Sequence, residues 1–284
     1  MNLPVVDFHI HPLVSEVIDE DKYKCQREVF GLRTSPQPLE TLLSQMQEAS
    51  VERGVLLALD CSVKANCSLP SNEEVASIVK KYPSKFVGFG SLHPYREGSL
   101  RELLEEEVIN LGLRGLKLNP SIQDFDPLSQ RALQLYGELE RLNLPLIVHT
   151  GLSWFPSTSL EYCKPLIWDN VARRFPNLKI VLSHLGWPWV WDAIAVALRN
   201  DNVFLDISNT FTGSPNEHLR YLLTELVPKR FVERFLNEKI IFGSDYPRIE
   251  IPKMVRALRG VGLKEEIEEA ILRLNALKIL GDEE

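Results

Sequence analysis

The sequence predicts a (β/α)8 barrel, the TIM-barrel fold, formed by a single domain over residues 1–284. Three observations predict it: eight short apolar runs, helical patterns between most of them, and the near-continuous apolar character of each run. Strands that alternate with helices indicate parallel β/α units, whose strands are buried on both faces. A doubly wound open sheet would have a glycine-rich phosphate turn after the first strand, and the sequence has none there.

The expected strands are rich in Val, Ile, Leu and Phe and are bounded by turn residues. They span residues 5–9, 55–60, 86–92, 115–119, 146–149, 179–184, 203–207 and 240–244. Helical periodicity covers a second set of segments, and Pro38 stands just before the first of them. These helices are expected over residues 39–52, 71–82, 99–111, 129–142, 168–175, 189–199, 253–259 and 264–280.

Two connections are too long for simple loops. Residues 11–38 separate the first strand from its helix and are expected to form a flap over the barrel mouth. Residues 209–236 follow the seventh strand and are expected to hold an insertion, a capping segment that contains Tyr221 and Phe231. A contact between two copies in a homodimer is an equally good interpretation of either connection.

Charge and composition restrict the class of partner. The net charge is −7, from 32 basic and 39 acidic residues, which argues against nucleic acid and anionic membranes as partners. No apolar run approaches the length of a membrane span, and no signal peptide is expected. The four cysteines show no C-x-x-C spacing, so reduced thiols are the simplest expectation. We therefore expect a cytoplasmic protein that binds a small-molecule substrate.

Chemically active side chains close several of the expected strands. Four of the six histidines end apolar runs, and an aspartate ends the last run; the set is His9, His11, His149, His184 and Asp245. Active sites of such barrels lie at the carboxyl ends of the strands, so these residues should converge on one rim. Histidine nitrogens and a carboxylate oxygen suit a borderline metal such as zinc. Histidines that only satisfy core hydrogen bonds are the structural alternative.

These residues also carry a family resemblance. The chain resembles the amidohydrolase superfamily over its full length, and within it the amidohydrolase-related branch of aminocarboxymuconate-semialdehyde decarboxylase-like proteins. The motifs are Asp7-x-His9-x-His11, Gly115-Leu116-Lys117-Leu118-Asn119-Pro120, His149-Thr150-Gly151, Ser183-His184-Leu185-Gly186 and Gly243-Ser244-Asp245-Tyr246-Pro247. The histidine and aspartate set is specific for the superfamily, whereas no motif fixes the substrate.

The resemblance implies one divalent metal, with Zn²⁺ as the first choice. Its ligands would be His9, His11, His149 and Asp245, and a water would take the open position. In well-tuned zinc enzymes the pKa of such a water falls to about 7. His184 would be the general base or would polarise the substrate, and Asp245 would also accept a proton.

Lys117 has three interpretations, because binuclear relatives carry a carboxylated lysine on the fourth strand. An uncarboxylated lysine would contact Asp245 or a substrate carboxylate. A carboxylated Lys117 would bridge a second metal, and a structural ion pair would have no function. Asn119 has the same parity and is expected nearer the mouth, in reach of substrate.

Two further residues are expected to contact substrate. Trp154 follows the fifth strand and would wall the pocket, although helix packing explains such a residue equally well. Arg248 follows Asp245 and would hold an anionic group, with a plain surface arginine as the alternative. His93 is expected only to cap a loop on the same rim, and no pattern supports a role for His218.

The sequence thus predicts a metal-dependent hydrolase that activates a metal-bound water against a small amide, lactone or ester, and the expected substrate carries a carboxylate. One alternative is a metal-dependent decarboxylase of an unsaturated or aromatic acid. Another is a metal-dependent nuclease or phosphoesterase, but that type of site would have a glutamate where this chain has Lys117.

Overall fold

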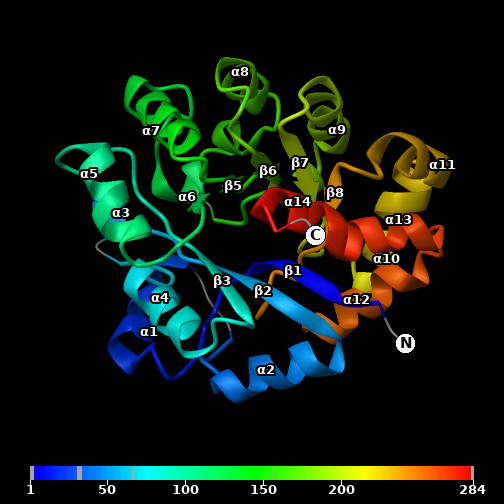
Figure 1. The fold of residues 1–284 in the computed structure, drawn as a ribbon, viewed down its shortest axis with the longest axis horizontal. Coiled ribbons are helices and arrows are strands. Elements are labelled where there is room, and N and C mark those ends of the chain that lie inside the picture. The colour runs from blue at the N-terminus through cyan, green and yellow to red at the C-terminus, as the bar shows by residue number, and fades with distance from the viewer. Residues whose placement is uncertain (1–2, 31–33, 66, 156, 283–284) are drawn as a thin grey trace.

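A computed structural model describes residues 3–30, 34–65, 67–155 and 157–282. Eight parallel strands form its centre and helices surround them, as Figure 1 shows. The strands are β1 (Val5–Ile10), β2 (Val51–Leu57), β3 (Phe86–Phe89), β4 (Leu116–Leu118), β5 (Leu146–Val148), β6 (Ile180–Leu182), β7 (Val203–Asp206) and β8 (Ile240–Ile241). Each predicted run overlaps a strand, although β2 begins four residues before the predicted residue 55, and the predicted barrel is confirmed.

Backbone hydrogen bonds close the ring of strands. Ladders join β1 to β3 in order and β4 to β8 in order, and all pairs are parallel. Single parallel bridges connect these two sets, Gly90 with Leu116 on one side and Ile10 with Tyr246 on the other. Closure pairs the strand edges that an open sheet would leave exposed.

The barrel interior is filled by apolar side chains that alternate with residues facing the helices. Its cluster comprises Val6, Phe8, Val55, Leu57, Val87, Phe89, Ile147, Val181, Phe204, Ile241 and residues of α14 (Asn275–Leu280). Arg114 and Lys179, which precede β4 and β6, donate to the carbonyls of Leu280 and Lys278. Helix α14 therefore covers the amino ends of the strands, and Figure 1 shows it across the centre.

The outer layer is formed by helices that follow the strands. They include α1 (Glu20–Phe30), α2 (Leu39–Glu48), α3 (Ser62–Ala65), α4 (Asn72–Lys81), α5 (Leu100–Leu104), α6 (Pro120–Gln123), α7 (Gln130–Arg141), α8 (Ile167–Arg174), α9 (Val190–Arg199), α10 (Pro215–Arg220), α11 (Lys229–Phe231), α12 (Ile251–Gly260) and α13 (Glu265–Glu269). Helix α2 ends before the predicted residue 52, because Ser50 has φ of 58° and Val51 already begins β2. Within the described ranges, no helix is long and apolar enough to cross a membrane.

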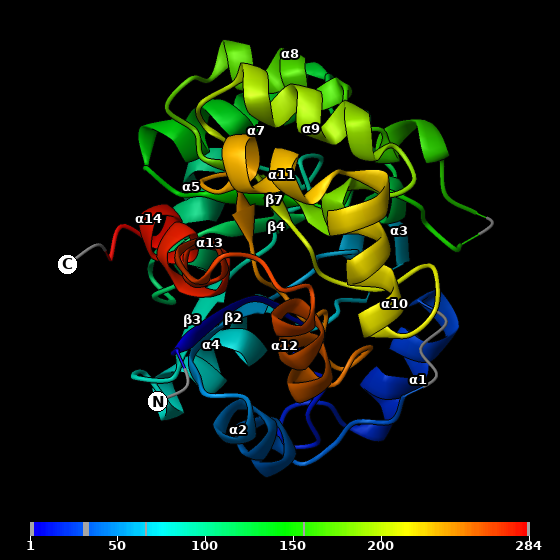
Figure 2. The same ribbon diagram turned by 90° about the vertical axis from the view of Figure 1, so that its right-hand side faces the viewer.

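The connection after β1 contains α1, which lies at the end of the barrel opposite α14 in Figure 2. A disulfide joins Cys25 of α1 to Cys67, after β2, and Gln26 Nε2 donates to Ser68 O at 3.0 Å. The expectation of reduced thiols is therefore wrong for this pair, because sequence spacing does not reveal which distant cysteines meet. Cys61 and Cys163 are free and buried.

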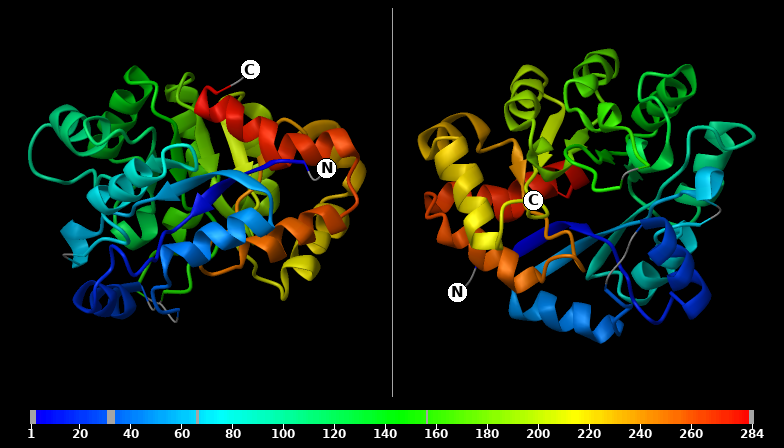
Figure 3. Two further views of the ribbon diagram at one scale, coloured as in Figure 1. Left: turned by 60° about the horizontal axis from the view of Figure 1, so that its bottom comes forward. Right: turned by 180° about the vertical axis from the view of Figure 1, so that it is seen from behind.

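The connection after β7 also holds extra helical segments, namely α10, α11 and the turns that extend them. They join the outer layer: Phe231 packs against Trp191 of α9, with ring centroids 5.6 Å apart. Figure 3 (right) views the barrel from the end opposite α14, with α10 at the periphery. The predicted insertion after the seventh strand is therefore confirmed, and Phe231 of this insertion packs in the helix layer.

Candidate active site

A cavity of about 680 Å³ lies at the carboxyl ends of the strands. Every predicted site residue lines it: His9, His11, Lys117, Asn119, His149, Trp154, His184, Asp245 and Arg248. Leu13 and Thr34, from the two ends of the connection after β1, also contribute, so that connection forms part of the wall. Apolar residues including Leu59, Leu69, Ile122, Leu152 and Phe155 form much of the remainder.

One group of potential metal ligands in the cavity comprises His9, His11 and Asp245. His9 Nε2 and His11 Nε2 are 3.2 Å apart. Asp245 Oδ1 is 3.5 Å from His9 Nε2 and 3.8 Å from His11 Nε2. Three potential ligand atoms from the two ends of the chain therefore face one small volume.

Local irregularities in β1 and beside β8 permit this approach. The pairing of β1 with β2 shifts register between Asp7 and Ile10, so Phe8 enters the interior cluster while His9 lines the cavity. Simple alternation, which would place Asp7 in the layer below His9, does not describe this strand. At Gly243 a Cβ atom would stand 2.7 Å from His9 Cβ, so glycine is needed for the close approach.

The two carboxylate oxygens of Asp245 face different partners, the histidines on one side and Arg248 on the other. Oδ2 is 3.4 Å from Arg248 Nε, while Oδ1 faces His9 and His11. Its φ of 63° is left-handed, a conformation that aspartate tolerates better than most residues. Burial raises the pKa of Asp245, and the neighbouring His9, Arg248 and Lys117 oppose that rise.

His149, at the end of β5, lies farther from this group. Its ring centroid is 5.0 Å from that of His184, and its Nε2 has no hydrogen-bond partner among the described residues. Burial lowers the pKa of His149 to about 3, and Lys117 and His9 add to the effect. A buried neutral imidazole with a free nitrogen in the cavity is available to bind a cation.

His184 follows β6 in a turn where its own φ is 60°. Its Nδ1 is 2.8 Å from Ser208 Oγ and 3.1 Å from Ser208 O. Because a carbonyl oxygen only accepts, the proton belongs on Nδ1, which leaves the lone pair on Nε2. Burial lowers the pKa of His184 well below its usual range, with a further contribution from His149.

Asp206 is a buried residue of this site that sequence reasoning missed. Its Oδ2 is 2.9 Å from His9 Nδ1. Burial alone would raise the pKa of Asp206. The electrostatic attraction to His9 and the hydrogen bond with His9 instead lower this pKa below the usual range. The signal was available, because Asp206 ends the apolar run of β7 as Asp245 closes the run of β8.

The donor set fits a divalent metal. Neutral imidazole nitrogens and a carboxylate are the ligands that zinc and similar ions take. His9 Nδ1 lies 2.9 Å from Asp206 Oδ2, and the other ring nitrogen, Nε2, faces His11 and Asp245. His9, His11 and Asp245 could therefore hold a metal, with the free nitrogen of His149 as a further donor.

Lys117 is almost fully buried beneath the cavity mouth. Its Nζ donates to Ser183 Oγ at 3.2 Å, and among the described residues no carboxylate lies within 4.0 Å of it. Burial lowers the pKa of Lys117 to about 8, although Asp206 and Asp245 oppose the shift. A direct contact with Asp245, one of the two contacts expected for an uncarboxylated Lys117, is therefore not formed, and a substrate carboxylate remains the other.

Asn119 has a structural role as well as a place in the cavity wall. Its Oδ1 accepts from Ile122 N at 3.2 Å and from Ser121 Oγ at 3.2 Å, and so caps α6. The side-chain Nδ2 of Asn119 has no hydrogen-bond partner among the described residues.

An aromatic stack stands at the cavity mouth. Phe211 stacks on Trp187 with ring centroids 4.8 Å apart and on Trp154 at 6.5 Å, and its edge meets His184. Trp154 is 62% exposed and lines the cavity, so it does not pack in the core. Phe211 comes from the loop after β7 and has no periodicity that would have revealed it.

The remaining histidines lie outside the cavity lining. His93 is 2.8 Å from Gln123 O and accepts from Tyr95 N, so it joins loops as expected. His218 Nδ1 accepts from Thr212 Oγ1 at 2.9 Å and steadies the loop that carries Phe211. Asp7 accepts from the backbone N–H groups of His9 and Ser244, and burial raises its pKa to about 7.

Comparison with known proteins agrees with this geometry. The family model described as "Amidohydrolase" matches residues 6–281. The chain belongs to the amidohydrolase family. The resemblance inferred from the motifs is therefore confirmed, and the family is one of enzymes.

A curated relative of this amidohydrolase is 2-amino-3-carboxymuconate-6-semialdehyde decarboxylase from Dictyostelium discoideum. It is 25% identical over 238 residues, which cover 74% of this chain and 65% of the relative. The chain thus matches a little less than two thirds of that protein's length.

Solved structures match over the full chain. An uncharacterized TIM-barrel protein from Bordetella bronchiseptica is 26% identical, with a TM-score of 0.76 and 99% of both chains covered. The 5-carboxyvanillate decarboxylase from Sphingomonas paucimobilis is 17% identical, with a TM-score of 0.66 and 99% of both covered. A protein provisionally assigned as a 2-pyrone-4,6-dicarboxylic acid hydrolase from Pseudomonas putida is 20% identical, with a TM-score of 0.69 and 100% of both covered. The last two likenesses show the fold.

Proposed function

We propose that this amidohydrolase is a metal-dependent decarboxylase of a small unsaturated or aromatic carboxylic acid. The observation that carries the proposal is the lining of the cavity, where Lys117, Arg248 and neutral His184 stand among largely apolar and aromatic side chains. The cations suit an anionic planar substrate, and the apolar wall suits the loss of its charge as CO2. The 25% sequence identity with a curated decarboxylase supports the same reaction.

One divalent metal, with zinc as the first choice, would be held by His9, His11, His149 and Asp245. When bound, it would act as a Lewis acid toward a substrate oxygen. The facing nitrogens of His9 and His11 and the free Nε2 of His149 support this ligand set.

The chain's own residues would bind the substrate and move one proton. The bond between the carboxylate carbon and its neighbouring carbon breaks, the electron pair stays on the neighbouring carbon, and CO2 leaves. His184 takes up a proton at Nε2 from solvent or from the substrate. It then donates this proton to that carbon. Lys117 and Arg248 hold anionic groups of the substrate while this occurs, and Trp154 and Asn119 orient it.

Hydrolysis of a small lactone, amide or ester, which the sequence predicts as the main activity, is the second candidate. The raised pKa of Asp245 supports it, because such a carboxylate readily accepts a proton from an attacking water. The comparisons support it less well than they support decarboxylation.

A paired assay separates the two candidates. The metal-loaded protein is incubated with 2,3- and 2,6-dihydroxybenzoate-type acids and 2-amino-3-carboxymuconate 6-semialdehyde, and CO2 release is measured. Lactones and amides are assayed in parallel by acid release. Release of CO2 that disappears after chelation supports decarboxylation. Metal-dependent acid release without CO2 release would contradict it and favour hydrolysis.

A further inference from the structure

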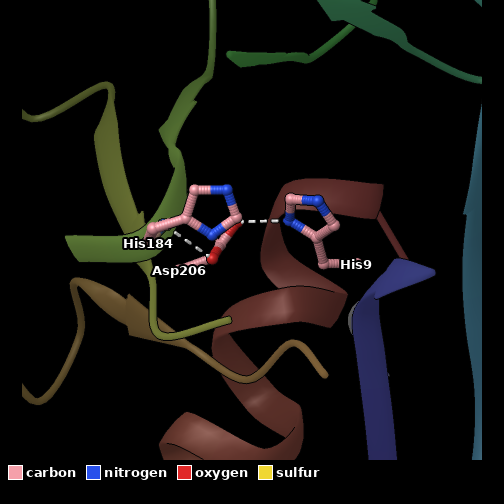
Figure 4. A group of neighbouring side chains, drawn as sticks. All are labelled: His9, His184 and Asp206. Atoms are coloured by element: carbon pink, nitrogen blue, oxygen red, sulfur yellow. Dashed lines mark hydrogen bonds and ion pairs between the residues drawn. The ribbon is translucent and has the colours of Figure 1, made fainter. Parts of the chain in front are cut away.

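One buried carboxylate, that of Asp206, lies between His9 and His184, as Figure 4 shows; it bonds to the imidazole of His9 and to the backbone N–H of His184. Asp206 Oδ2 lies 2.9 Å from His9 Nδ1. Asp206 Oδ1 accepts from the backbone N–H of His184 at 3.0 Å and of Ser208 at 2.8 Å, and it also contacts Ser208 Oγ. Asp206 has no exposed surface, so these protein groups rather than solvent satisfy its oxygens.

We propose that Asp206 is a positioning residue that fixes His9 in the tautomer with the proton on Nδ1. The Nε2 lone pair of His9 is then held toward His11 and Asp245. The consequence for metal binding rests on the proposed metal centre, whereas the tautomer is a property of the chain itself.

The direction of each hydrogen bond follows from the donors. An ionised carboxylate only accepts, and backbone N–H groups only donate. Oδ1 therefore accepts from the backbone of His184 and Ser208, and Oδ2 accepts a hydrogen bond that His9 Nδ1–H donates. A neutral imidazole has a single N–H, so His9 Nε2 has no proton and can bind a cation.

The tautomer of His184 does not depend on the same bond. Its Nδ1 lies 3.1 Å from Ser208 O, a carbonyl that any residue at position 208 retains. Ser208 Oγ is 2.8 Å from the same nitrogen and adds a second acceptor. A change at the Asp206 side chain should therefore act on His9 and spare the proton on His184.

The substitution Asp206→Asn gives a sharp test because an amide has one acceptor and one donor. The two backbone N–H groups require the amide oxygen at the Oδ1 position. The amide nitrogen then faces His9 Nδ1, which must accept, so the proton moves to Nε2 and blocks the metal position. Metal affinity should fall by about 10- to 100-fold, the range typical of such supporting partners.

The experiment uses the full chain with ¹⁵N-labelled histidine, stripped of metal, at pH 8. Long-range ¹H–¹⁵N spectra report the tautomer of each histidine, and His9→Gln and His184→Gln variants assign the signals. We expect Nδ1–H for His9 and His184 in the parent chain, and a switch to Nε2–H for His9 alone in Asp206→Asn. Competition with a chromogenic chelator measures Zn²⁺ affinity.

Asp7→Asn is the matched control. Asp7 is equally buried and accepts from the backbone of His9, but among the described residues its carboxylate makes no hydrogen bond to an imidazole. It should leave the His9 tautomer and the Zn²⁺ affinity unchanged within about threefold.

An Nε2–H tautomer for His9 in the parent chain would overturn the proposal, and this measurement needs no variant to fold. Unchanged His9 signals and Zn²⁺ affinity in Asp206→Asn would also overturn it, as would an equal loss of affinity in Asp7→Asn. If the tautomers are as expected but the parent chain binds no divalent metal, the positioning role is supported and the proposed metal centre fails.

Discussion

His9 Nε2 lies 3.2 Å from His11 Nε2, and the two nitrogens face each other across a space that Asp245 Oδ1 also borders. His9 carries its proton on Nδ1, beside Asp206, so its lone pair points into that space. Burial, together with the charges of His9, Lys117 and Arg248, lowers the pKa of His11 well below its usual range, which favours a neutral ring. Acceptor atoms that converge in this way are stabilised by a cation between them.

The double substitution of His9 and His11 by alanine should therefore abolish tight metal binding. The parent chain is expected to retain about one equivalent of divalent metal after dialysis, as a mononuclear site requires. Plasma emission spectroscopy measures the content. His218→Gln is the control, because His218 is buried but lies outside the cavity lining. Full retention in the double variant would exclude this ligand set.

His184→Asn should separate metal binding from chemistry. The asparagine amide can replace Nδ1–H as the donor to Ser208 O, so the loop should keep its shape. The asparagine side chain has no nitrogen that can take up and release a proton. A general acid–base group contributes about 10²–10⁴-fold to the reaction rate. We expect kcat to fall by that factor while metal content stays constant. Loss of metal in this variant would instead make His184 a ligand.

Lys117→Met tests whether the buried lysine binds a substrate carboxylate. Its Nζ hydrogen-bonds to Ser183 Oγ and, among the described residues, has no carboxylate partner, so a substrate anion can take that place. A hydrogen bond to a charged group contributes about 1.5–3 kcal/mol, so KM should rise roughly 10- to 100-fold for carboxylate substrates. With its pKa lowered to about 8 by burial, Lys117 is charged below pH 8, and KM in the parent chain should rise above that pH.

A carboxylated Lys117 would give a different result. Activity and metal loading would depend on added bicarbonate, and about two metals per chain would fall to one in Lys117→Met. Lys117→Arg supplies the matched variant, because it keeps the charge but cannot form the carbamate bridge. Retained carboxylate affinity in Lys117→Arg supports the anion-binding role.

The strand-end residues could be predicted because apolar runs and their last residues are local properties of the sequence. His149 and Asp245 are each preceded by such a run, and the barrel brings run ends together. Asp206 also follows an apolar run, but the predicted strand extended to Ile207, so Asp206 was placed inside the strand and not at its end. Had the expected strand ended at Asp206, as β7 does, this carboxylate would have stood at a strand end like the other site residues.

Loop conformation set the limit of the prediction. Ser208 and Phe211 reach the site because Asn209 adopts φ of 67°, which no periodicity encodes. The Cys25–Cys67 disulfide joins residues 42 positions apart, and pairing over such distances cannot be deduced from one sequence. The early end of α2 likewise depends on the backbone turn at Ser50.

His218 should make the fold less stable in acid. Burial lowers its pKa to about 4, against about 6.5 in an unfolded chain. Between these pH values the unfolded chain binds the extra proton and the folded chain does not, so the free energy of unfolding falls as pH falls. The loss from this residue should approach about 3 kcal/mol below pH 4.

His218→Gln should remove that part of the pH dependence. The glutamine oxygen can still accept from Thr212 Oγ1, and it does not titrate. Urea unfolding of metal-stripped protein at pH 7.5 and pH 4.5 measures the effect in the parent chain and in the variant. Other buried histidines contribute equally to both chains, so the difference between the two pH dependences isolates His218. The variant should lose less stability on acidification; an identical loss in both chains would show that His218 is already protonated when folded, or that the loop opens to admit the proton.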